Sequence, residues 1–166
     1  MNDELSKQLN EHFSELEASH AAANERSRTY KEKEQALKDE FQKIKKEIIQ
    51  PAMIQIRDAL LARNYPAAII IEDQRVGAEP DWPYIAFHAS NDIKHASVVG
   101  HNPMFRASFR WFIGQVEFSA TRMMVKGVPQ NAFSTKLTLS DLTRQTIDDL
   151  LLDSIRGMFP IIRAEQ

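Results

Sequence analysis

Residues 9–48 read LNEHFSELEASHAAANERSRTYKEKEQALKDEFQKIKKEI, and their spacing determines how the chain begins. Twelve positions follow one another in steps of four and three, which is the spacing of a coiled-coil seam. These positions, called the stripe below, are Leu9, Phe13, Leu16, His20, Ala23, Ser27, Tyr30, Glu34, Leu37, Phe41, Ile44 and Ile48. Large apolar residues lie at the two ends of this stripe, and smaller or polar residues from His20 to Glu34 lie at its centre. The pattern predicts a helix whose apolar stripe needs a partner surface.

No glycine or proline interrupts the chain from Asp3 to Gln50, and most residues there are strong helix formers. We therefore expect one continuous helix, about 70 Å long at about 1.5 Å per residue. A turn within residues 19–27, which would fold this segment into a helical hairpin, is the alternative.

The predicted helix is longer than the rest of the chain is wide. A domain of about 115 residues has a radius of gyration of about 13 Å, so it cannot cover the whole stripe. Because large exposed apolar stripes are rare in monomers, we predict a homo-oligomer, most simply a two-fold dimer. The interface would consist of the large apolar members of the stripe: Leu9, Phe13, Leu16, Leu37, Phe41, Ile44 and Ile48.

Pro51 marks the predicted end of this first segment. Proline removes an amide donor and disfavours a straight continuation of the helix, so we expect a kink or a short break there. The apolar pattern resumes from Met53 to Arg63 and predicts a short second helix. The chain is therefore divided into a helical, coiled-coil assembly segment over residues 1–50 and a globular domain over residues 51–166.

The middle of the chain has the alternating pattern of short strands separated by turns. Residues 104–113 show it most clearly, because Phe105, Ala107, Phe109, Trp111 and Ile113 would share one face. Five or six strands are predicted in all, over residues 67–73, 84–89, 93–99, 104–113, 116–125 and 133–139. Their connections are too short for parallel crossovers, so the sheet should be mainly antiparallel.

A last helix is predicted over residues 141–158. Ser140 would be its N-cap, and Gly157 and Pro160 would end it. The helices over residues 51–63 and 141–158 would cover one face of the sheet. The predicted fold class is therefore α+β, with a long N-terminal helix, a short second helix, a mainly antiparallel sheet and a C-terminal helix packed on that sheet.

Composition bounds the classes of function. The 166 residues are 43% hydrophobic and 27% charged, which is typical of a globular protein, and no run reaches the roughly 20 apolar residues of a membrane span. The chain has no cysteine, which excludes disulfides, thiolate metal sites and thiol nucleophiles and suits a reducing compartment. Because the first residues also lack the apolar core of a secretory signal, we expect a cytoplasmic protein without a membrane partner.

Charge is distributed unevenly although the chain carries only −2 in total. Residues 93–140 contain one acid, Glu117, and six bases, a net charge of +5 within a chain that carries −7 elsewhere. Such asymmetry indicates an anionic partner, either a nucleic acid or an acidic protein, unless acidic helices of the same chain neutralise it. Alternation places Arg106 and Arg110 on one strand face, and Lys94, Arg122 and Lys136 could join them if neighbouring strands align. The predicted anion-binding residues are Arg106, Arg110, Lys94 and Arg122, with Lys136 as a further candidate.

Histidines and carboxylates are the other candidates for metal binding or catalysis. His88, His95 and His101 match no compact metal-binding pattern, and they would form a site only if separate strands converge. The acidic residues Glu72, Asp73, Glu79 and Asp81 fall in a loop interrupted by prolines and a glycine. No nucleophile elbow or glycine-rich phosphate loop is present, so no metal, cofactor or catalytic residue is assigned.

These observations favour a non-enzymatic oligomeric binding or adaptor protein. The N-terminal helix would assemble the protein, and the basic sheet face would bind an anionic or protein partner. Two alternatives remain open: a nucleic-acid-binding protein that uses residues 94–136, and a small enzyme with a pocket between the sheet and a helix.

Overall fold

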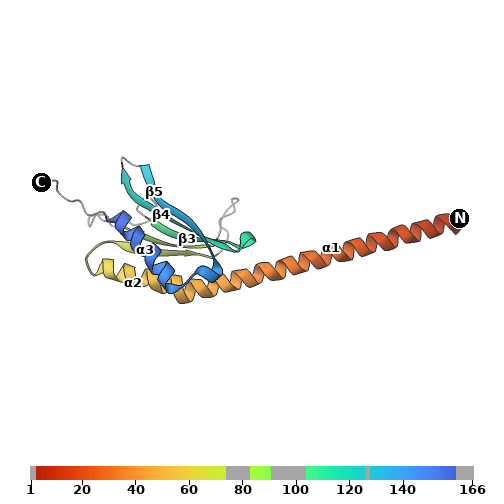
Figure 1. Ribbon diagram of the computed structural model, residues 1–166, viewed down its shortest axis with the longest axis horizontal. Helices are drawn as coiled ribbons and strands as arrows, with labels where there is room; N and C mark the ends of the chain where they lie inside the picture. Colours follow the sequence, from red (N-terminus) through yellow and green to blue (C-terminus); the bar gives the residue numbers. More distant parts are fainter. Residues whose placement is uncertain (1–2, 74–82, 91–103, 126–127, 160–166) are drawn as a thin grey trace. The chain divides into compact units, whose positions relative to one another are not determined.

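A computed structural model describes residues 3–73, 83–90, 104–125 and 128–159, with the side chains of residues 122–132 left outside the description. Within these ranges the fold is α+β (Figure 1). The chain divides into two units, Met1–Lys38 and Asp39–Gln166, which are described separately. No helix in the described ranges combines the length and the apolar character needed to cross a membrane.

The first unit consists of helix α1, which spans Asp3–Ile44 and continues into the second unit. The predicted continuous helix is confirmed, and the alternative of a hairpin around residues 19–27 is wrong. Ion pairs between residues three or four positions apart lie on the exposed surface of α1 and stabilise the helix. Arg28 contacts Glu25 at 3.0 Å and Glu32 at 3.5 Å. Such exposed pairs add little stability each, so the uninterrupted run of helix formers is the main local cause of this helix.

The helix continues through Pro51, so the short break, one of the two alternatives predicted there, is absent. A π-helical turn, η1 (Lys45–Ile49), joins α1 to α2 (Gln50–Leu61), and the backbone stays in the helical region on both sides. The N–H of Gln50 donates to the carbonyl of Lys45, five residues earlier. A proline normally clashes with the carbonyl four residues before it, and the wider π turn relieves this crowding while the missing N–H lies within the first turn of α2.

The second unit contains a five-stranded sheet in which every neighbouring pair is antiparallel, as predicted. The spatial order of the strands equals their order in the sequence. The sixth predicted strand, residues 93–99, lies outside the described residues. The strands are β1 (Ala67–Glu72), β2 (Tyr84–Ala89), β3 (Met104–Arg110), β4 (Gln115–Val125) and β5 (Val128–Thr138).

Strand β3 is shorter than the predicted strand over residues 104–113. It ends at Arg110, and Trp111–Ile113 form a 3-10 turn before β4 begins. Gly114 closes this turn with φ of 63°, a left-handed conformation that glycine adopts without a steric penalty. Because the strand has already ended, Ile113 is 46% exposed and does not continue the buried face.

The C-terminal helix α3 (Arg144–Met158) also begins later than predicted. Ser140 belongs to a 3-10 turn, Leu139–Asp141, rather than to the helix N-cap. The N-cap is Thr143, whose hydroxyl accepts a hydrogen bond from the N–H of Thr146 at 3.2 Å. The hydroxyls of Ser140 and Thr138 lie 2.9 Å apart, and the Thr138 hydroxyl donates to Asp141, so local bonds of the 3-10 turn occupy the residue expected to cap the helix.

One face of the sheet forms the core of the second unit. Helix α2 contacts β1 and β2, α3 contacts β3 and β4, and the two helices contact each other, so they form one layer on one face. Along β3 and β4 the buried side chains of this face alternate with half-buried neighbours, whereas on β2 the intervening Ala86 and His88 are buried as well. The buried members of the helix-covered face include Ile85, Phe87, Phe105, Ala107, Phe109, Val116, Phe118 and Ala120. The predicted covering of the sheet by these two helices is thus confirmed.

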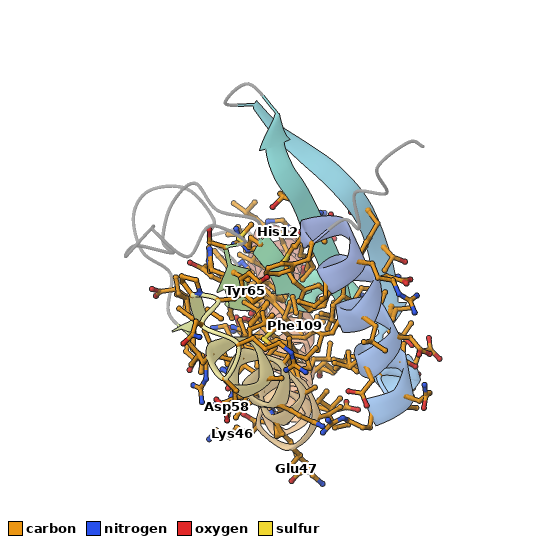
Figure 2. The ribbon with its side chains drawn as sticks, turned by 90° about the vertical axis from the view of Figure 1, so that its left-hand side faces the viewer. His12, Lys46, Glu47, Asp58, Tyr65 and Phe109 are labelled. Atoms are coloured by element: carbon orange, nitrogen blue, oxygen red, sulfur yellow. The ribbon has the colours of Figure 1, made fainter. Side chains whose placement is uncertain are left out.

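The last turns of α1 are part of this core. Phe41 is 1% exposed and stacks on Phe109 with a centroid distance of 4.6 Å and an interplanar angle of 12°. In Figure 2, Phe109 lies between the sheet and the helices, whereas Lys46 and Glu47 point away from the sheet. The side chains that pack on the sheet therefore begin near Phe41, ahead of the boundary at residue 50 that the sequence predicted.

We expect Phe41→Ala to lower the free energy of unfolding of the second unit by about 3–5 kcal/mol, because it removes a buried ring and leaves a cavity beside Phe109. Chemical denaturation followed by circular dichroism would measure the loss. Leu152→Ala on α3, where the side chain is 49% exposed, is the matched control and should change stability by less than about 1 kcal/mol. Equal losses in the two variants would contradict the packing described for Phe41.

Candidate functional site

The sheet face opposite the helices carries two of the predicted anion-binding residues. Arg106 and Arg110 alternate with the buried Phe105, Ala107 and Phe109 on β3, so both project to this outer face, as their spacing predicted. Strand pairing adds further polar residues to the same face. Ser108 lies opposite Tyr84 on β2 and Glu117 on β4, and Glu117 lies opposite Lys136 on β5.

The two arginines have different partners. The guanidinium of Arg106 lies 3.9 Å from the ring centroid of Tyr84, a cation–π contact that leaves its charge in place. The guanidinium of Arg110 forms an ion pair with Glu117, which also accepts a hydrogen bond from Ser134 at 3.3 Å. The Nε atoms of both arginines are buried and have no hydrogen-bond partner among the described residues. Glu117, the single acid within residues 93–140, therefore neutralises Arg110, one of the two predicted arginines.

The structure does not describe the side chains of the other two predicted anion-binding residues. Lys94 lies outside the described residues. Arg122 belongs to β4, but its side chain is among those left outside the description. Lys136, the further candidate from the sequence, is exposed on β5 and lies directly opposite Glu117 on this face.

His88 is the one predicted histidine within the described ranges. It lies on β2, is 8% exposed, and has a buried Nδ1 without a hydrogen-bond partner. Burial lowers the pKa of this imidazole, so the neutral form is favoured in the folded protein. His95 and His101 fall outside these ranges, and the described residues contain no group of three acidic or histidine side chains that could hold a metal ion.

The acidic loop contributes one side chain with a structural role. Asp73 forms an ion pair with Lys45 and accepts a hydrogen bond from Gln42 at 3.1 Å. Lys45 is 2% exposed, so its ammonium depends on this carboxylate to replace water. Burial alone would raise the pKa of Asp73, but the hydrogen bonds from Lys45 and Gln42 outweigh it and hold the pKa below its ordinary value. Glu79 and Asp81 lie outside the described residues.

The predicted assembly stripe separates into two parts. In the first unit its large members are exposed, with 40% for Leu9, 54% for Phe13 and 41% for Leu16, and Tyr30 of the same stripe is 55% exposed. In the second unit Phe41 is buried in its own core, and Ile44 and Ile48 are half-buried. Leu37, near the boundary, is also half-buried. The surface that stays open to a partner is therefore the N-terminal part of the stripe.

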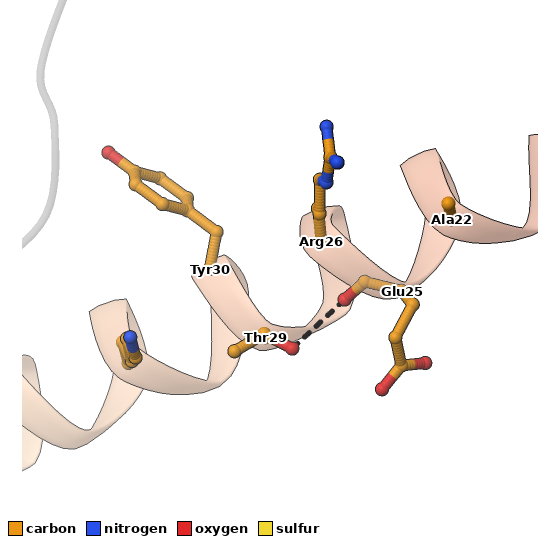
Figure 3. A pocket seen from close by; sticks show the side chains of 6 residues that line it. Ala22, Glu25, Arg26, Thr29 and Tyr30 are labelled. Atoms are coloured by element: carbon orange, nitrogen blue, oxygen red, sulfur yellow. Dashed lines mark hydrogen bonds between the residues drawn. The ribbon is translucent and has the colours of Figure 1, made fainter. Parts of the chain in front are cut away.

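A shallow depression lies on α1 beside this stripe. Its described lining residues all belong to α1: Ala22, Glu25, Arg26, Thr29, Tyr30 and Lys33 (Figure 3). Their spacing of three and four residues places them along one side of the helix, so they border a groove and do not enclose a cavity. Such a groove suits the side chains of a second helix better than a small molecule.

No protein family, curated protein or solved structure matches this chain.

We expect Asp73→Asn to destabilise the protein more than Lys45→Met does. The first change leaves the buried ammonium of Lys45 without its counter-ion, at a cost of about 1–3 kcal/mol, whereas the second replaces it with an apolar chain of similar length. Because the folded pKa of Asp73 is lowered, its contribution is complete above the unfolded pKa, near 3.8, and disappears as pH falls through the folded pKa. Denaturation at pH 7 and at successively lower pH below 4 would measure both effects. A larger loss in Lys45→Met would contradict this account.

We expect His88→Leu to flatten the pH dependence of stability on the acidic side of neutrality. The folded pKa of His88 is lowered, so below about 6.5 the unfolded chain binds a proton that the folded chain does not, and the wild type loses stability as pH falls. Unfolding curves between pH 8 and pH 5 would show a steeper loss in the wild type than in the variant. Identical slopes would contradict the buried, neutral state of this histidine.

Proposed function

We propose that this protein is a non-enzymatic, cytoplasmic, self-assembling binding or adaptor protein whose N-terminal helix pairs with the same helix of a second copy. One observation carries this proposal: Leu9, Phe13, Leu16 and Tyr30 follow heptad spacing on α1, and each is at least 40% exposed. A heptad stripe fits the same stripe of another chain by knobs-into-holes packing. The absence of cysteine from the sequence suits a reducing compartment.

Burial of these side chains would supply the driving force for assembly. Each large apolar side chain gains about 1.5–3 kcal/mol when it moves from water into a packed interface. A two-fold dimer uses every one of them twice, because the same surface of both chains takes part. The charged residues around the stripe keep the rest of the helix solvated and confine the contact to one side.

The outer sheet face gives weaker support for binding an anionic partner than α1 gives for assembly. Arg110 is already paired with Glu117, whereas Arg106 keeps its charge above the ring of Tyr84. An anionic partner of the assembled protein would therefore be held mainly by Arg106, with Lys136 on the same face. This part of the proposal is secondary to assembly through the helix.

We expect the wild-type protein at tens of micromolar to have a mass of about 38 kDa by light scattering, twice the 19.0 kDa of one chain. The triple variant Leu9→Gln, Phe13→Gln and Leu16→Gln should weaken association by at least about 100-fold, because it removes most of the apolar area while placing a good helix former at all three positions. Circular dichroism would verify that the second unit remains folded.

The matched control for this experiment carries the same chemical change outside the stripe. Leu61→Gln with Leu152→Gln alters two side chains that are 47% and 49% exposed on α2 and α3, and it should leave the mass unchanged. A monomeric wild type with a folded N-terminal helix would refute the proposal. Loss of the dimer in the control as well as in the triple variant would place the interface elsewhere.

A further inference from the structure

Charge divides the first unit into two halves of opposite sign. Residues 3–17 contain five acids and one base, a net charge of −4, whereas residues 18–38 contain three acids and five bases, a net charge of +2. Between them, residues 18–24 read ASHAAAN and carry no formal charge when histidine is neutral. Two copies of such a helix attract when the acidic half of one lies along the basic half of the other.

The members of the stripe also distinguish the two orientations. In a parallel dimer in register each position faces itself, so Glu34 would meet the partner's Glu34 and Ser27 would meet the partner's Ser27. Two carboxylates brought together in a desolvated seam repel strongly. The centre of a parallel seam would therefore hold mostly small or polar layers, and one like-charged layer at Glu34, in place of large apolar ones.

The residues beside the stripe add a second objection to the parallel orientation. Helical geometry places Arg26 on one edge of the seam and Lys31 on the other edge, five positions further along the chain. In a parallel dimer these two positions face each other across the interface, so Arg26 would lie beside the partner's Lys31. Both are exposed cations in the structure, and this contact would occur twice in a two-fold dimer.

We propose that two copies pair the helices of their first units in an antiparallel orientation, centred on the alanines at 21–23. This inference rests on the proposed function and specifies its geometry. Leu9 then lies level with the partner's Glu34, Phe13 with the partner's Tyr30, and Leu16 with the partner's Ser27. Each of these layers pairs a large apolar side chain of residues 3–17 with a smaller or more polar member of the stripe between Ser27 and Glu34. No polar residue then faces its own copy.

The same register resolves the conflicts at the edges of the seam. Arg26 lies beside the partner's Ser19, and Glu17 lies beside the partner's Asn24, so neither meets a like charge. At the centre, the run of alanines allows the two backbones to approach closely. Arg26 and Lys33, which border the depression beside Tyr30, lie on the edge of the seam and in this register run along the acidic half of the partner helix (Figure 3).

Disulfide trapping can test the orientation, because the sequence contains no cysteine that would compete. Asn10→Cys and Lys31→Cys lie on the edge of the seam outside the apolar stripe and should preserve assembly. An equimolar mixture of the two full-length variants, one carrying a mass tag, should form the mixed disulfide under mild oxidation. Neither should form much disulfide alone, because the antiparallel register separates like positions by at least about 28 Å along the axis, beyond the roughly 7 Å that a disulfide spans.

A second variant reports the parallel orientation directly. Leu9→Cys lies within the stripe, so a parallel dimer in register would trap it as a homodimer, whereas the antiparallel dimer separates the two sulfurs by about 38 Å. Leu152→Cys on α3 measures the background from random collisions. We expect Leu9→Cys to remain at this background, and a dominant Leu9→Cys homodimer without the mixed disulfide would overturn the antiparallel assignment.

Light scattering on the same samples separates the two levels of the proposal. Dimeric samples that trap the Leu9→Cys homodimer would reject the antiparallel geometry and leave assembly through the helix intact. Monomeric wild-type protein would reject assembly itself. A dimer that traps neither pair above the Leu152→Cys background would overturn the register and orientation proposed for the helix.

Discussion

The stacking of Phe41 on Phe109 determines where the long helix α1 joins the core of the second unit. Phe41 lies near the end of α1, and its ring is held between the helix and the centre of the sheet. Beyond it, Lys45, Ile49 and Met53 follow at intervals of four residues and are fully buried, and Ala52 beside Met53 is buried too. This spacing of four residues differs from the heptad spacing of the stripe, whose members Ile44 and Ile48 are only half-buried. The π turn lies across this region, and its wider winding allows a side chain every fourth residue to remain directed at the sheet.

The change of spacing explains why the apolar stripe has two roles. In the second unit the helix follows the requirements of its own core, and a buried lysine is accepted there because Asp73 neutralises it. In the first unit the original spacing of four and three persists, and the large residues on it remain exposed. A single heptad pattern in the sequence therefore corresponds to two surfaces, one for the chain's own core and one that we propose for a second copy.

Much of the fold could be predicted because side-chain periodicity has a direct physical cause. The alternation through Phe105, Ala107 and Phe109 follows the pleat of a strand that buries one face, and the absence of proline and glycine allows α1 to run without a break. The errors arose where local alternatives compete closely. Ser140 and Thr143 are both good N-caps, and the hydrogen bonds of the 3-10 turn decided between them. At Pro51, a π turn removed the steric conflict on which the predicted break depended.

The candidate sites were less predictable because they depend on pairing between distant residues. Period-two spacing placed Arg106 and Arg110 on one face, but the ion pair of Arg110 with Glu117 follows from the register between β3 and β4. No sequence pattern indicated that Lys45 would be buried, since a lysine in a charged helix is normally exposed.

The first unit also shows why assembly and helix formation should be coupled. Isolated helices in water are only marginally stable, and most of their stability in proteins comes from packing of an apolar face. Residues 3–38 form a long helix whose described side chains are almost all exposed, so its own charges and helix formers must hold it until the stripe is covered. A second copy would supply that cover from the same sequence, because its acidic half complements the basic half of the first. In the antiparallel dimer that we propose, the polar centre of the stripe would have a physical role. It would destabilise the parallel orientation and favour the pairing of Leu9, Phe13 and Leu16 with the partner's residues between Ser27 and Glu34.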